Sequence, residues 1–143
     1  MTPLDMTVEE LEAIIAGAYE EQLLREGRLT AQQLGEHDYS YAIPEITDGP
    51  ERPGPEERTE RFRRFVIDQL EHKLTRSKAL LHTKLCVEAK YCRNKSAEGL
   101  GVIVGALDGI LMAIIGYPVP VITVAAWLIK TKWLDRLCEC EAT

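Results

Sequence analysis

One apolar stretch, residues 100–129, most constrains how this chain of 143 residues can fold. It is interrupted by a charge at Asp108 and by a turn-forming cluster at residues 116–120. Pro118 and Pro120 each lack a backbone N–H, and they push the preceding residues toward extended geometry. With Gly116 they predict a turn, so the stretch becomes a hairpin of two apolar helices, over 96–115 and from 119 or 121 to 137.

Small residues recur at every fourth position of the first hairpin helix, namely Ala97, Gly101, Gly105, Gly109 and Ala113. Residues four apart share one face of a helix, so this row forms a groove with almost no side chains. Glycine inside a helix costs up to about 1 kcal/mol relative to alanine. Three glycines at this spacing therefore predict helix packing, in which another helix presses its backbone into the groove.

The ends of the hairpin are basic and its tip is uncharged, which is the pattern of a hairpin inserted into a membrane from the cytosol. We expect Lys130, Lys132 and Trp133 to be its membrane-interface anchors, because lysine and tryptophan side chains reach the headgroup level. The hairpin would span a thin bilayer or enter it part way. The alternative is a soluble helical assembly that buries the hairpin, since apolar segments of roughly 10–14 residues are more often core than membrane.

Asp108 is the one charge within this apolar stretch. A carboxylate in hydrocarbon is costly, so Asp108 is expected to face a protein partner, a lumen or a cation. In a ring of subunits it would lie at the pore or at an interface. The alternative is that a Lys or Arg of another helix neutralises it, or that it is protonated.

The first part of the chain divides into two segments. In residues 1–35, Thr7 and Glu10 have the spacing of a capping box, which predicts a helix over 8–25 that ends before Gly27. Thr30 caps a short second helix to residue 34. Residues 36–55 hold too many prolines and glycines for a regular element. They form a linker or a docked arm, and the alternation of Tyr39, Tyr41, Ile43 and Ile46 favours the arm, with a short strand as the alternative.

Residues 56–95 contain no proline and no glycine and carry a helical apolar stripe: Phe62, Val66, Leu70, Leu74, Leu81, Leu85 and Ala89. An unbroken helix here would be roughly 55–60 Å long. This long amphipathic helix is a helical hairpin arm, a coiled-coil-like element, or two helices with an unmarked break. With the hairpin and a cysteine-containing tail in 96–143, the fold class is all-α: an N-terminal amphipathic helix, a long central helix and a C-terminal apolar helical hairpin in an expected oligomer.

Charge and motifs exclude several functions. The net charge is −6, and no basic patch is interleaved with aromatic residues, which argues against a nucleic-acid partner. The chain has no phosphate loop, nucleophile elbow or dinucleotide fingerprint, so we expect no enzyme activity and no cofactor. Asp68, Glu71 and His72 are neighbours of a kind that any charged helix supplies.

The cysteines suggest only a weak metal site. His82 and Cys86 are four apart, and Cys92, Cys138 and Cys140 would lie near the base of the hairpin, but their spacings are not those of usual zinc knuckles. We therefore expect no metal; a small metal or redox protein is a third, weaker interpretation. The start of the chain lacks a secretion signal, which predicts cytoplasmic synthesis, inner-membrane association and four reduced cysteines.

The layout of 100–129 and its basic flanks resembles that of small bacterial conflict-system proteins, which pair a cytosolic helical region with a two-helix membrane hairpin. The resemblance implies a defence or toxin-type effector. The first hypothesis is therefore a non-enzymatic, self-assembling protein whose hairpin inserts into, perturbs or pierces a membrane. The second is a soluble oligomeric adaptor or scaffold, with the hairpin buried between subunits or against a larger protein. In both, two apolar rods need lipid or sister chains to cover them.

Overall fold

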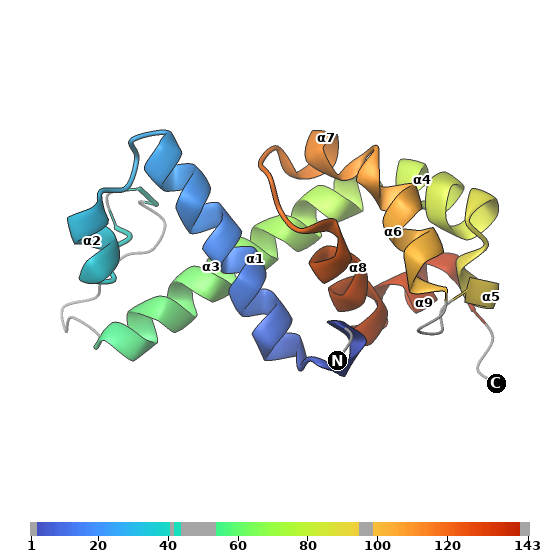
Figure 1. Cartoon of the computed structure of the whole chain (residues 1–143), viewed down its shortest axis with the longest axis horizontal. Coiled ribbons are helices and arrows are strands. Elements are labelled where there is room, and N and C mark those ends of the chain that lie inside the picture. The colour runs from blue at the N-terminus through green and yellow to red at the C-terminus, as the bar shows by residue number, and fades with distance from the viewer. Residues whose placement is uncertain (1–2, 41, 44–53, 95–98, 141–143) are drawn as a thin grey trace.

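The computed structural model describes residues 3–40, 42–43, 54–94 and 99–140, and every regular element in these ranges is helical. The predicted all-α class is confirmed. In Figure 1, α1 crosses α3 near the middle of the molecule, α2 lies at one end, and α4, α5, α6 and α9 gather at the other. The elements are η1 (Pro3–Asp5), α1 (Val8–Arg25), α2 (Ala31–Gly35), α3 (Pro55–Arg76), α4 (Lys78–Leu81), η2 (His82–Glu88), α5 (Tyr91–Asn94), α6 (Leu100–Asp108), α7 (Leu111–Ile115), α8 (Val121–Lys130) and α9 (Trp133–Cys138).

Capping boxes begin the first two α-helices, as the sequence predicts. Thr7 Oγ1 accepts from the Glu10 N–H at 3.1 Å, and Glu10 Oε1 accepts from the Thr7 N–H at 3.1 Å. Thr30 and Gln33 repeat this exchange at α2. Two exchanges of this kind satisfy N–H groups that the first turn of a helix leaves without partners. After α1 the chain reverses at Gly27, whose φ of +71° is a conformation that glycine adopts readily.

The described part of the 36–55 segment packs against its own chain. Tyr39 and Ile43 are buried, and the Tyr39 ring stacks on Phe62 of α3 with 4.0 Å between ring centroids. Arg58 Nε and Nη2 donate to the carbonyls of His37 and Glu36, which fastens the same segment to the start of α3. Tyr41, Ile46 and the proline-rich run 44–53 lie outside the described residues.

The long central helix is divided, so the unmarked break is the correct alternative. α3 ends at Arg76, where the Ser77 N–H points to the carbonyls of both Lys73 and Leu74. Beyond α4, η2 is a π-helix, in which each N–H bonds five residues back and the turn is wider than in an α-helix. The wider turns leave Leu81, Leu85 and Ala89 buried in succession. The segment then reverses at Lys90, which has a φ of +52°.

Both hairpin helices are also divided. The first is split at Gly109 and Ile110 into α6 and α7, and the second at Thr131 and Lys132 into α8 and α9. Between α7 and α8 lies the turn expected at 116–120, with Gly116 at φ +90° and Pro120 directly before α8. Ser96, the expected cap of the first helix, lies outside the described residues.

Helix α8 lies at the centre of the core. It packs against α1, α6, α9 and η1, and the five residues from Val124 to Leu128 are buried almost completely. The expectation that both apolar rods need lipid or sister chains to cover them is therefore wrong for α8, because helices of the same chain cover it. The most exposed large apolar side chains of the hairpin, Val102 and Met112, lie on the other rod, α6 and α7, although Ile122 of α8 is exposed as well.

Candidate interaction surface

The small-residue row of α6 faces outward. A Cβ atom built on Gly101, Gly105 or Gly109 would meet nothing within 4 Å, and Gly101, Gly105, Gly109 and Ala113 are all exposed. No helix within the described ranges packs into this row, contrary to the simplest form of the expectation. Ala97, the first member of the row, lies outside those ranges. The open side of the row is therefore free for a partner from outside this chain.

A groove runs between this face of α6 and the π-helix η2, with a volume of about 510 Å³. Residues of both elements line the groove. The two elements lie in contact at the end of the molecule opposite α2 (Figure 1). The lining residues are Lys84, Glu88, Ala89, Val102, Gly105, Ala106, Gly109 and Ile110. Because Gly105 and Gly109 leave the α6 side of the groove without side chains, an approaching helix can reach the backbone of α6.

Three large apolar side chains on α6, α7 and η2 are exposed, and one of them, Val102, lines this groove. Val102 on α6 is 48% exposed, Met112 on α7 is 54% exposed and Val87 on η2 is 59% exposed. Single exposed apolar residues are common on protein surfaces, but a patch of them around a groove marks a site of interaction. We call the groove and these three side chains the α6 surface.

The charges of the α6 surface have both signs. Lys84 Nζ lies 3.3 Å from Glu88 Oε2, and both side chains are partly exposed. Asp108, the last residue of α6, is exposed and forms no ion pair with any residue that the structure describes. In a single chain Asp108 therefore lines no pore. Its carboxylate can pair with a cation of another molecule.

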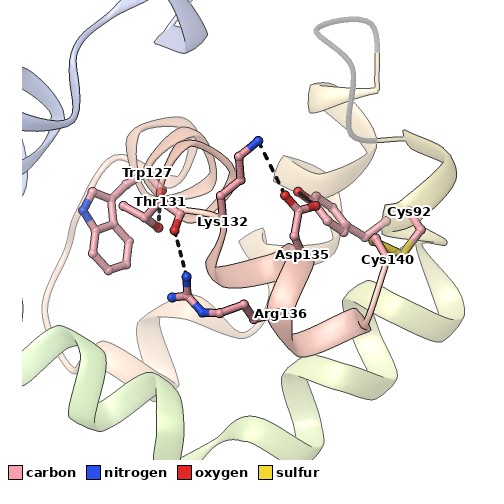
Figure 2. A network of polar contacts seen from close by, with 8 residues as sticks. Cys92, Trp127, Thr131, Lys132, Asp135, Arg136 and Cys140 are labelled. Atoms are coloured by element: carbon pink, nitrogen blue, oxygen red, sulfur yellow. Dashed lines mark hydrogen bonds and ion pairs between the residues drawn. A yellow bond between two sulfur atoms is a disulfide. The ribbon is translucent and has the colours of Figure 1, made fainter. Parts of the chain in front are cut away.

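The expected membrane anchors contact their own chain. Lys130 Nζ donates to the Leu4 carbonyl at 3.0 Å, which ties the end of α8 to η1. Lys132 Nζ lies 3.8 Å from Asp135 Oδ2, as Figure 2 shows, and Trp133 is half-buried. Across the described ranges, no helix is both long enough and apolar enough to cross a bilayer.

The cysteines differ from the expectation of four reduced thiols. Cys86 is bonded to Cys138 and Cys92 to Cys140, so all four are in disulfides. Their sulfur atoms are therefore not thiolate ligands in this state. His82 is exposed on η2, and no group of three or more His, Cys, Asp or Glu side chains in the described residues is arranged to hold a metal ion. The sequence predicts that the hairpin brings the cysteines close together. It does not predict that they form disulfides.

Several polar contacts that hold the hairpin in place have no motif in the sequence. Trp127 Nε1 of α8 donates to Glu12 Oε2 of α1 at 3.0 Å, and Lys73 Nζ of α3 donates to the Ile115 carbonyl at the end of α7. Lys73 also lies over the Tyr117 ring, 5.3 Å from its centroid. Burial lowers the pKa of Lys73. The only sequence signal for these contacts is a polar group on an otherwise apolar face.

Two acidic side chains in the N-terminal half have raised pKa values. Burial raises the pKa of Glu20, while the hydrogen bond from Tyr39 and the nearby His37 oppose this shift. Burial also raises the pKa of Glu71, and the neighbouring Asp68 and Glu12 add to that shift. Glu71 and Asp68 come from one helix and Glu12 from another, but the structure brings no nucleophile or bound group to them. The described residues thus offer a surface for association more clearly than a catalytic constellation.

No family model matches this chain, and comparison with curated proteins and with solved structures finds no match either.

Proposed function

We propose that this protein is a non-enzymatic helical module that associates with a second copy of itself through the α6 surface. One observation carries the proposal: the glycine row of α6 faces outward, and none of the residues that the structure describes packs into it. Gly105, in the interior of α6, costs up to about 1 kcal/mol relative to alanine. No helix contact among the described residues offsets this cost. A partner helix packed in the groove would offset it.

A second copy suits this surface because the surface is complementary to itself. In a two-fold dimer the same patch meets its own image, so a patch must offer both members of every pair. The groove is lined by the ion pair of Lys84 and Glu88 and by small and apolar residues, and the exposed Asp108 precedes its lining residue Gly109. In such a dimer Asp108 of one copy pairs with Lys84 of the other, and Val102 covers the glycines of its partner.

Size-exclusion chromatography with light scattering tests this proposal on paired variants. Gly105→Leu fills the groove, so we expect it to raise the dissociation constant of the dimer at least tenfold, the effect of about 1.4 kcal/mol. Gly17→Leu is the matched control, because Gly17 is also helical with nothing near its Cβ position but lies on α1. Circular dichroism verifies that both variants stay folded. Equal masses for both variants and the unaltered chain would contradict the assignment of the surface.

Association with a membrane is the second candidate, and the exposed Val102 and Met112 on the hairpin favour it. A bacterial effector made in the cytoplasm would place this apolar surface on the inner membrane. Deeper insertion of the hairpin requires α8 to leave α1, which breaks the contact between Trp127 and Glu12 and that between Lys130 and the Leu4 carbonyl. Flotation with anionic phosphatidylglycerol vesicles separates the candidates: a membrane protein floats with the lipid, and a self-associating module stays at the bottom as a dimer.

A further inference from the structure

The two disulfides fasten the same two segments of the chain side by side. Cys86 and Cys92 come from η2 and α5, and both bond to the C-terminal segment, at Cys138 and Cys140. The Tyr91 hydroxyl also donates to Asp135 Oδ1 at 3.0 Å. Within the C-terminal segment, Arg136 donates to the Thr131 carbonyl, as Figure 2 shows. Disulfides and hydrogen bonds therefore both hold the end of α9 in place.

The two bridges are not equally accessible. Cys92 is exposed, whereas its partner Cys140 and both cysteines of the other bridge are half-buried. A surface cavity of about 250 Å³ opens at this point, lined by Cys86, Lys90, Cys92 and Arg93. One sulfur of each bridge thus borders a cavity large enough for a small molecule.

The same cavity is positively charged. Lys90 and Arg93 are exposed, and neither forms an ion pair within the part of the chain that the structure describes. Cations beside a disulfide attract a thiolate and stabilise the thiolate that leaves. Exposed disulfides are reduced more readily than buried ones, and labile or regulatory disulfides are of this kind.

We propose that this cavity is a site of thiol–disulfide exchange, at which a small, negatively charged thiol opens the bridge between Cys92 and Cys140. The thiolate of the small molecule attacks the Cys92 sulfur, the bond to Cys140 breaks, and Cys140 leaves as a thiolate. A second small thiolate then attacks the mixed disulfide and releases Cys92. Two small thiols are oxidised to one disulfide, and the protein bridge gains two electrons and two protons.

The bridge between Cys86 and Cys138 keeps the C-terminal segment in place during this exchange. It is the less accessible bridge, and the hydrogen bond from Tyr91 to Asp135 supports the same segment. Opening the outer bridge therefore frees the chain end from residue 139 onward without unfolding α9. This exchange does not depend on self-association, so either proposal can fail alone.

Timed reduction of the folded, oxidised chain tests the site. The protein is treated at low salt with glutathione or with the uncharged 2-mercaptoethanol, at matched thiolate concentrations, then alkylated and mapped by peptide mass spectrometry. We expect a mixed disulfide at Cys92 and opening of this bridge at least tenfold faster than that of the inner bridge. Opening of both bridges at one rate that rises with added urea would overturn the proposal, because reduction would then require unfolding.

Charge variants test the role of the two cations. In the double variant Lys90→Gln, Arg93→Gln, we expect the rate with glutathione to fall about three- to tenfold, because two exposed cations that line the cavity are removed. The rate with 2-mercaptoethanol should change much less. The matched control is Arg76→Gln, Lys78→Gln, which removes two cations that do not border the cavity. An unchanged ratio of the two rates in the Lys90 and Arg93 variant would overturn the role of the cations.

Discussion

The indole N–H of Trp127 donates to the Glu12 carboxylate at 3.0 Å, across 115 positions of sequence. Trp127 is the largest fully buried side chain, and its one polar atom finds its partner on α1. This contact joins the central helix of the apolar hairpin to the N-terminal helix. It shows that the two ends of the chain share one core.

Trp127→Phe removes this donor and leaves the half-buried Glu12 carboxylate without it. We expect the free energy of unfolding to fall by about 2–3 kcal/mol, from the lost hydrogen bond and the cavity that the smaller ring leaves. Urea denaturation followed by circular dichroism measures it. Glu12→Gln is the control, because its amide oxygen still accepts, and it should cost less than about 1 kcal/mol. Equal costs for the two variants would show that the hydrogen bond contributes nothing.

Lys73→Met tests how the end of the hairpin is held on α3. The variant keeps most of the apolar stem but removes the donor to the Ile115 carbonyl and the cation over Tyr117. We expect a loss of about 1–2 kcal/mol in unfolding free energy. Lys78→Met, at an exposed position on α4, should change it by less than about 0.5 kcal/mol. A Lys73 variant as stable as the Lys78 variant would contradict this role.

Glu20 makes stability depend on pH with a definite sign. Its pKa is raised in the folded state, so its contribution to stability is fully present below its ordinary pKa and is lost as the pH rises through the raised value. Glu20→Gln stays neutral but still accepts from Tyr39. We therefore expect the variant to be more stable than the unaltered chain at pH 7, with the difference shrinking toward pH 4. Thermal unfolding at both values measures this; a difference that grows on acidification would refute it.

Removal of the disulfides should be strongly non-additive. The bridges span 52 and 48 positions, but with one bridge closed the other closes a loop of only 6 + 2 residues, from 86 to 92 and from 138 to 140. Loop-closure entropy then predicts a cost of about 2.5 kcal/mol for losing either bridge and about 4 kcal/mol more for losing the second. Urea denaturation of paired Cys→Ser variants measures this. Equal costs at both steps would contradict the nested arrangement.

The sequence predicted those features that local chemistry specifies. Thr7 and Thr30 begin helices because a capping box needs only residues three apart, and the turn at Gly116 follows from the nearby prolines. The breaks at Ser77 and Lys90 could not be predicted, because no glycine or proline marks them and the packing of Leu81 and Leu85 decides them.

The candidate surface was predicted only in part. Periodicity shows that Gly101, Gly105 and Gly109 share a face, but whether that face points inward depends on which other helices compete for the core. Helix α8 takes the central position instead, with five consecutive buried residues from Val124 to Leu128. The pairing of the cysteines was missed because it depends on how η2 and α9 meet, and on a redox compartment that spacing does not reveal.

Sedimentation velocity of the unaltered, oxidised chain tests the central claim most directly. If the α6 surface binds a second copy, the weight-average sedimentation coefficient rises with concentration between about 1 µM and about 100 µM, from the value of a 16.1 kDa monomer toward that of a dimer. A sedimentation coefficient that stays at the monomer value across this range would contradict the account.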